Sequence, residues 1–282
     1  MTLPTFTLRQ MIEAGVHFGH HARRWNPKMA PYIYGKKDSV HIIDLQKTYP
    51  MLYTAMATTK EIAAQGGKVL FVATKRQAQD IIKENAERCG QYFVNQRWLG
   101  GMLTNWKTVH KSITRLVKLN EMFEKGELEG YTKKELQGMK KEQEKLQLEL
   151  GGIMNMGGQP DLLFVIDTCK EALAIKEAKK LGIPVIGICD TNADPEAVDL
   201  PVPGNDDAIR AIQFYSEMIS AAVLDGMQAQ IAAQGVKVEE MVAEKDETPA
   251  PAKKKTAKKA AEKPAEKAAG KAAGKTTKKK AE

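Results

Sequence analysis

The sequence lacks the features that mark membrane-spanning and disulfide-rich secreted proteins. No run of about 18 apolar residues occurs, so we expect no transmembrane helix. Met1–Gln10 lacks the charged-then-apolar pattern of a signal peptide. The three cysteines, Cys89, Cys169 and Cys189, form no CxxC pair, which argues against a disulfide framework and a zinc ribbon. We therefore expect reduced thiols in a cytoplasmic protein.

The sequence is equally poor in catalytic motifs. Residues 269–276 (AGKAAGKT) satisfy the loose pattern of a phosphate-binding loop, but both flanks are Lys/Ala-rich instead of a strand and a helix. The glycine pairs at 151–152 and 157–158 precede a predicted strand, whereas a dinucleotide fingerprint follows one. No Gly-x-Ser-x-Gly elbow occurs. We expect a protein that is not an enzyme.

Charge is distributed unevenly along the 282 residues. Residues 1–118 hold 18 basic and 7 acidic residues, a net of +11, whereas residues 119–243 hold 12 basic and 22 acidic residues, a net of −10. Residues 244–282 return to a net of +7, with 13 lysines and 6 acids. The first and last parts therefore suit a polyanionic partner, and the middle part does not.

Apolar runs alternate with amphipathic segments over most of the chain. Strands are predicted at 69–73, 92–94, 162–166, 185–189 and 199–202, and helices at 7–14, 45–65, 76–89, 170–181 and 206–226. This alternation predicts an α/β fold with a parallel sheet of flavodoxin-like strand order and helices on both faces. Residues 16–37 are predicted to be mostly irregular, with a hairpin whose strands flank residues 35–38.

Residues 107–150 carry no strand signal. Apolar residues recur at spacings of three and four in two runs, namely Val109, Ile113, Leu116 and Phe123, then Leu136, Met139, Leu146 and Leu150, with Asn120 and Gln143 as polar interruptions. Glycines bound residues 126–130 between the runs, which predicts an antiparallel coiled-coil helical hairpin. Each helix of roughly 18 residues spans about 27 Å, enough to protrude. Two helices packed flat on the body are the alternative.

The C-terminal segment has a composition unlike the rest. From Thr248 onward only Ala, Lys, Pro, Glu, Gly and Thr occur, and such a segment cannot bury enough apolar surface to offset its ordering entropy. We predict three parts: residues 1–106 and 151–230 as an α/β RNA-binding domain, residues 107–150 as a helical hairpin insertion, and residues 244–282 as a disordered, basic Lys/Ala-rich tail.

Two segments, 17–28 and 96–107, interleave cations, aromatic residues and amides. Arginine contacts phosphate through a fork of donors, and Trp or His can stack on an unpaired base. The predicted RNA-binding residues are His17, His20, His21, Arg23, Arg24, Trp25, Asn26, Lys28, Lys36, Lys37, Lys75, Arg76, Gln96, Arg97, Trp98, Thr104, Asn105, Lys107 and Lys111. The alternative is a solvated basic face with Trp25 and Trp98 buried in the core.

A cation site is a second hypothesis. Asp190 ends a predicted strand, and Asp206 and Asp207 open a predicted helix, so all three lie at the carboxyl edge of the sheet, where ligands usually bind. With His17 they are candidate ligands of a structural divalent cation. The alternative is that the two adjacent aspartates favour the positive end of a helix and that the histidine packs or contacts RNA. No other cofactor is expected.

Six segments resemble, in order, signatures of the bacterial small-subunit ribosomal protein two family. They are GVHFGHHARRWNPKM (15–29), VHIIDLQKT (40–48), FVATKR (71–76), QRWLGGMLTNWKT (96–108), PDLLFVIDTCKEALAIKEAKKLGIPVIGICDTNADP (160–195) and PGNDDAIRAI (203–212). The resemblance runs from about residue 5 to 227, with the helical hairpin in the expected place. It implies an α/β domain with a protruding coiled-coil hairpin.

The resemblance also implies a function. The chain would be a late-assembling structural constituent of the cytoplasmic ribosome that supports translation and binds small-subunit ribosomal RNA between head and body. Partners would include neighbouring small-subunit proteins and, in several bacteria, the large messenger-binding ribosomal protein one, but no membrane and no small-molecule substrate. Two alternatives remain: a flavodoxin-like or sugar-isomerase-like enzyme, which would need a phosphate cradle after a strand, and a free RNA-binding regulator.

Overall fold

The computed structural model describes residues 3–126 and 131–233. The predicted turn between the hairpin helices lies partly outside the described residues, and the predicted tail at 244–282 lies wholly outside them. Over the part of the chain that is described, no helix is long and apolar enough to cross a membrane.

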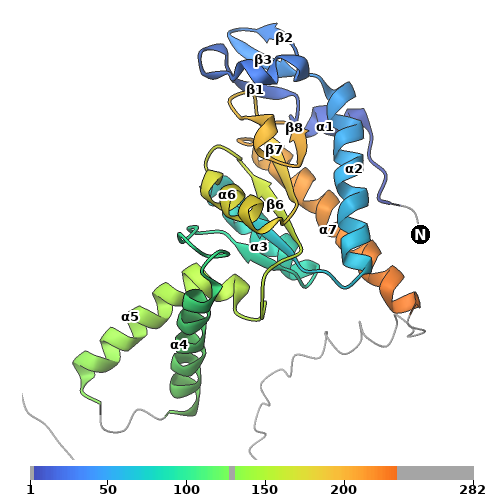
Figure 1. The fold of residues 1–282 in the computed structure, drawn as a ribbon. Coiled ribbons are helices and arrows are strands. Elements are labelled where there is room, and N and C mark those ends of the chain that lie inside the picture. Colours follow the sequence, from blue (N-terminus) through green and yellow to red (C-terminus); the bar gives the residue numbers. More distant parts are fainter. Residues whose placement is uncertain (1–2, 127–130, 234–282) are drawn as a thin grey trace, which may run out of the picture. The chain divides into compact units, whose positions relative to one another are not determined.

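A parallel five-stranded sheet forms the centre of the fold (Figure 1). Its strands are β4 (Val69–Val72), β5 (Tyr92–Val94), β6 (Leu162–Ile166), β7 (Val185–Cys189) and β8 (Leu200–Pro203). They lie in the order β5-β4-β6-β7-β8, and all neighbours are parallel. Numbered within this sheet, the order is 2-1-3-4-5, that of flavodoxin-like folds. The predicted fold class is confirmed for the sheet.

Side chains alternate between two apolar clusters on opposite faces of the sheet. Phe71 and Phe164 point into one cluster, and Leu70 and Leu163 into the other. The first face is covered by α1 (Leu8–Ala14), α2 (Leu45–Ala64), α3 (Arg76–Arg88) and α7 (Ile209–Ala233), and the second by α6 (Ala172–Leu181) and the residues around the base of the helical hairpin. Helices on both faces were predicted, because buried parallel strands need cover on each side.

A second, antiparallel sheet precedes the first along the chain. Its order is β1-β3-β2, with β1 (Phe18–His21), β2 (Ile33–Lys37) and β3 (Val40–Ile43). The sequence predicted the β2–β3 hairpin but centred its turn on residues 35–38. The turn is made by Asp38 (φ 48°) and Ser39 (φ 67°), which have the positive φ that a two-residue hairpin turn requires.

Strand β1 was not predicted, since residues 16–37 were expected to be mostly irregular. It is four residues long, it contains a glycine, and its register with β3 is interrupted between its ends. Such a strand carries no alternating apolar pattern of its own. Two 3₁₀ turns, η1 (Ala22–Arg24) and η2 (Pro27–Tyr32), connect β1 to β2. The chain from residue 18 to 43 is therefore more regular than its sequence indicated.

Residues 106–150 form two helices, α4 (Trp106–Lys125) and α5 (Lys133–Leu150), as predicted for the insertion. The two polar interruptions meet, because Gln143 Nε2 donates to Asn120 Oδ1 at 2.7 Å. Buried Val109, Ile113 and Leu116 join Leu150 in the apolar cluster beside the sheet. The helical pair is thus anchored at its base, while its coiled-coil character and its protrusion stay predictions.

Candidate functional site

Charged side chains converge at the carboxyl edge of the parallel sheet. Lys75 follows β4, Asp167 follows β6, and Asp190 follows β7, while Asp206 and Asp207 precede α7. The ammonium nitrogen of Lys75 lies 2.9 Å from Asp167 Oδ2, 2.7 Å from Asp206 Oδ1 and 2.9 Å from Asp207 Oδ1. We call these five residues, together with His20, the acidic cluster. Asp167 adopts φ 64°, a conformation that is uncommon for a residue other than glycine.

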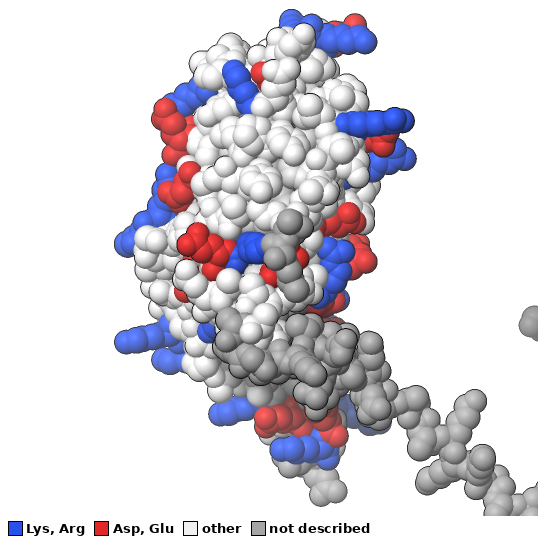
Figure 2. All heavy atoms as spheres, turned by 90° about the vertical axis from the view of Figure 1, so that its right-hand side faces the viewer, with Lys and Arg blue, Asp and Glu red and all other residues white. Residues whose placement is uncertain are grey.

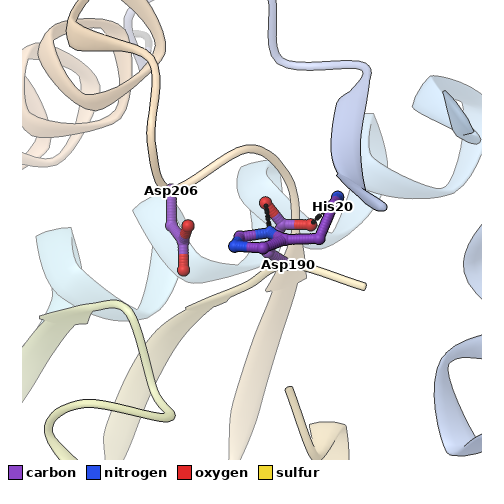
Figure 3. Close-up of side chains that lie close together, drawn as sticks. All are labelled: His20, Asp190 and Asp206. Carbon is purple, nitrogen blue, oxygen red and sulfur yellow. Dashed lines mark hydrogen bonds and ion pairs between the residues drawn. The ribbon is translucent and has the colours of Figure 1, made fainter. Parts of the chain in front are cut away.

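His20 connects strand β1 to this cluster (Figure 3). Its backbone N–H donates to Asp190 Oδ1 at 3.1 Å and to Thr191 Oγ1 at 3.0 Å. Its imidazole Nδ1 lies 2.9 Å from Asp190 Oδ2, and Nε2 lies 3.3 Å from Asp207 Oδ2. The preceding Gly19 permits this approach, since a Cβ there would lie 2.6 Å from Thr191 Cγ2. The small sheet is therefore joined to the large one through a buried carboxylate.

Burial and mutual repulsion shift the titration of the acidic cluster. The hydrogen bond to Asp190 raises the pKa of His20 to about 8, against the opposing effect of burial. Burial, reinforced by Asp190 and Asp167, raises the pKa of Asp206 to about 7 in spite of Lys75. Four carboxylates face two cationic side chains, so the cluster carries an excess of negative charge whenever all its groups are ionised. A bound cation would relieve that excess.

Three groups of the cluster have the geometry of a cation site. One ligand atom each from His20, Asp190 and Asp206 can be chosen so that all lie within 4.8 Å of one another. The predicted histidine was His17, whereas the histidine that lies beside the aspartates is His20. The His17 ring lies against Phe18, at 4.0 Å between ring centroids. The cation site itself stays a prediction. A cation here would share Asp206 with Lys75.

A basic hollow, which we call the basic cup, lies between η1 and the β2–β3 turn. Its volume is about 710 Å³, and it is lined by His21, Ala22, Arg23, Arg24, Lys36 and Ser39. No carboxylate is among these lining residues. A concave surface with three permanent cations, one imidazole and one hydroxyl suits a phosphate group.

The predicted RNA-binding cations divide into paired and unpaired groups. Lys28 contacts Asp194 and Glu196 at 2.9 and 2.5 Å, and Lys75 is held in the acidic cluster. Within the described residues, no ion pair is made by Arg23, Arg24, Lys36, Lys37, Arg76, Arg97, Lys107 or Lys111. The second group keeps its charge available for an anion from outside the chain, whereas Lys28 and Lys75 are already paired with carboxylates.

The two predicted stacking residues have different environments. Trp25 follows the basic cup and is 40% exposed, with its ring 5.5 Å from that of His41. Trp98 is only 8% exposed, and its indole N–H donates to Glu177 at 3.2 Å. Trp25 can therefore stack on a base, whereas Trp98 lies in the core, where it supports the loop instead of stacking.

Glu177 of α6 organises the loop before α4, and sequence reasoning missed it. Its carboxylate accepts backbone N–H groups of Gly101 at 2.8 Å, Leu103 at 3.0 Å and Thr104 at 3.2 Å, besides the Thr104 hydroxyl at 3.2 Å and the Trp98 indole. These hydrogen bonds lower the pKa of Glu177 against the effect of burial. The loop is thereby fixed with Arg97 exposed beside it.

Several other predicted RNA-binding residues have structural partners. Asn26 Oδ1 accepts the N–H of Lys28 and starts η2, Asn105 Oδ1 accepts the Thr108 hydroxyl, and Thr104 binds Glu177. Gln96 is exposed beside Arg97. Ser39 was missed because the turn was centred elsewhere. Asp167 was missed too, although it follows a strand just as Lys75 does, and the rule for the carboxyl edge could have found it.

A weakly charged surface lies over α2. Figure 2 looks onto the side where Figure 1 shows α2, and Lys and Arg gather mainly along its rim, leaving a broad uncharged area. Exposed Leu8 and Ile12 of α1 and Tyr49 and Tyr53 of α2 belong to these elements. Such a surface is poorly suited to phosphate and better suited to a protein neighbour.

Comparison with known proteins gives a single family. The sequence model of the ribosomal protein S2 family matches residues 11–226. A protein of Rhodospirillum rubrum named small ribosomal subunit protein uS2 is 63% identical over 238 residues, which cover 84% of this chain and 91% of that protein. Its namesakes from Rhodospirillum centenum and Gluconobacter oxydans are 61% and 59% identical, over 84% and 86% of this chain and 90% and 93% of theirs.

Proposed function

Since this chain belongs to the ribosomal protein S2 family, we propose that it is a structural constituent of the small ribosomal subunit that binds small-subunit ribosomal RNA. The RNA-binding part of the proposal is supported by one observation: some of the cations are paired with carboxylates, whereas others have no ion pair. Arg23, Arg24 and Lys36 line a hollow without a carboxylate, and Arg97 and Lys107 are likewise without an ion pair to any described residue. Unpaired cations on a folded surface bind phosphate and release its counterions.

Membership of the family supports a finer proposal. We propose that the chain lies between the head and the body of the small subunit, joins it late in assembly, and supports translation on cytoplasmic ribosomes. Two separate basic segments support this placement, because the basic cup and the Arg97–Lys111 segment can each contact RNA. A protein that joins late needs contacts to RNA helices that are already folded, and phosphate contacts meet that need.

The carboxyl edge of the sheet supports a role without catalysis. Flavodoxin-like enzymes bind ligands at the switch point of the strand order, which here lies between β4 and β6. Lys75 and Asp167 occupy that point and bind each other at 2.9 Å. Glu171 closes it further by accepting the N–H of Thr74 at 3.0 Å. The side chains at the switch point thus engage one another, which supports a role without catalysis.

Two further partners are proposed. The acidic cluster would hold a structural divalent cation through His20, Asp190 and Asp206, which would also tie β1 to the large sheet. The weakly charged surface over α1 and α2 would face protein neighbours, among them the large messenger-binding ribosomal protein one. Deleting that protein from cells should leave the chain in the small subunit, because the RNA contacts are separate.

Sedimentation tests the proposed function. A tagged copy of the full chain should travel with the small subunit through a sucrose gradient and stay there after a wash in moderate salt. A copy with Arg97→Ala, Lys107→Ala and Lys111→Ala should leave the subunit at a lower salt concentration, since each lost phosphate contact weakens binding. Recovery of the unchanged chain in the free-protein fractions at low salt would contradict the proposal.

A further inference from the structure

We propose that the basic cup and Trp25 form one composite site for single-stranded RNA, in which the cup binds backbone phosphate and the Trp25 ring stacks on an unpaired base. This inference rests on the proposed function and specifies which RNA structure the chain recognises. The ligand class is a loop, bulge or strand end, and a continuous duplex is excluded because its bases are already stacked on each other.

The cup is held in shape before any ligand arrives. The N–H of Ala22 donates to Ser39 O at 2.9 Å, which joins η1 to the β2–β3 turn across the hollow. His21 is paired with Val40 in the β1–β3 register. The positive φ values of Asp38 and Ser39 make a tight turn that leaves Lys36 on the adjoining strand. A preformed site loses less conformational freedom on binding than a flexible one.

The cations of the cup form no ion pairs with the described residues. Arg23, Arg24 and Lys36 are exposed, and none of them has an ion pair with a described residue. Lys28, only four residues after Arg24, is by contrast bound by two carboxylates. A volume of about 710 Å³ lies within the range of about 300–1,000 Å³ typical of ligand pockets. The hollow is therefore large enough for a nucleotide phosphate with its sugar.

Trp25 supplies the stacking half of the proposed site. It directly follows Arg24, and its backbone is extended. The next residue, Asn26, donates its N–H to Thr191 O at 2.8 Å, which fixes the chain against the large sheet. His41 backs the indole at 5.5 Å with a tilt of 35°. A supported and 40% exposed indole offers a flat apolar face to a base.

The experiment uses the full chain and three RNA probes of equal length: a hairpin with an open loop, an unstructured strand and a blunt duplex. Binding is measured by fluorescence anisotropy of labelled RNA and by quenching of protein tryptophan. The loop and the strand should bind more tightly than the duplex and should quench. Trp25→Leu should abolish most of the quenching and weaken loop binding roughly 5- to 100-fold, with an unchanged salt slope.

The phosphate half of the site is tested by Arg23→Ala, Arg24→Ala and Lys36→Ala together. This variant should weaken binding of every probe and reduce the slope of log affinity against log salt by about two units for single strands. The matched control removes three exposed cations elsewhere, Arg9→Ala, Lys83→Ala and Lys180→Ala. Circular dichroism and the thermal midpoint of each variant establish that it is folded.

Four outcomes would overturn the inference: equal losses in the cup variant and the control, duplex binding as tight as loop binding, quenching that is undiminished in Trp25→Leu, or an acidic peptide that competes as well as RNA. The last would make the cup a protein-binding site. Failure of the composite site is distinguishable from failure of the proposed function. A Trp25→Leu chain that binds loops normally but still sediments with the small subunit refutes only the inference.

Discussion

Glu177 shows how one buried residue can determine a loop that the sequence marks as functional. The segment 96–107 was identified by its cations and aromatics, but its shape depends on a carboxylate about 70 residues further along the chain. No local sequence pattern identifies Glu177 as the partner of this loop, because the amphipathic pattern of α6 does not depend on that residue. Both Arg97 and Trp98 were predicted to bind RNA, and only the folded structure shows that Arg97 is exposed while Trp98 is buried.

We predict that Glu177→Gln lowers the free energy of unfolding by about 2–3 kcal/mol at neutral pH, because the amide NH₂ would face backbone donors that need an acceptor. The pKa of Glu177 is depressed in the folded state. Its stabilisation is therefore present above the unfolded pKa and is lost as pH falls through the folded pKa. Urea denaturation of both chains should converge in acid, and exposed Glu144→Gln should behave like the unchanged chain.

The acidic cluster permits a second prediction at the scale of single residues. Adding Zn²⁺ or Mn²⁺ to the purified chain should raise its thermal midpoint by several degrees, as expected when a ligand at about 100 times its Kd adds about 2.7 kcal/mol. His20→Ala and Asp190→Asn should remove the increase, while His17→Ala should retain it. An equal increase in all four chains, or none in the unchanged chain, would contradict a cation site at His20.

At the scale of elements, the long regular parts were predictable and the short coupled parts were not. The buried strands were found from uninterrupted apolar runs such as Leu162–Ile166, and the helices from their 3.6-residue period. Strand β1 was missed because its stability comes from partners outside itself, namely β3 on one side and Asp190 with Thr191 below it. His17 was predicted in place of His20 for the same reason, because the position of His20 depends on the contact of β1 with Asp190 and Thr191.

The contact of β1 with the large sheet can be tested by steric substitution. Gly19→Ala should destabilise the chain by about 1–3 kcal/mol, because the new Cβ would lie 2.6 Å from Thr191 Cγ2. Adding Thr191→Ser removes that methyl group and should restore part of the loss, which thermal unfolding can measure. Gly35→Ala is the control, since a Cβ there meets no atom within 4 Å. Equal effects at the two glycines would refute the account.

For the whole molecule, the fold class and the family resemblance could be predicted from the sequence, whereas only the structure shows which charged side chains are paired. A count of cations assigns a net +11 to residues 1–118 without distinguishing Lys28, held by Asp194, from Arg23, held by none of the described residues. Ion pairs such as Lys28–Asp194 and Lys75–Asp206 join residues more than 100 positions apart, so they follow from topology and not from local pattern. The division into paired and unpaired cations is what points to an external polyanion.

Ultraviolet cross-linking of the chain within intact small subunits tests the central claim most directly. RNA-linked peptides are identified by mass spectrometry after digestion of both protein and RNA. The account predicts cross-links to small-subunit ribosomal RNA in the peptides that contain Trp25 and Arg97, and none in the peptides of α2, whose surface is weakly charged. Cross-links confined to α2, or RNA contacts absent while the chain stays in the subunit through proteins alone, would contradict it.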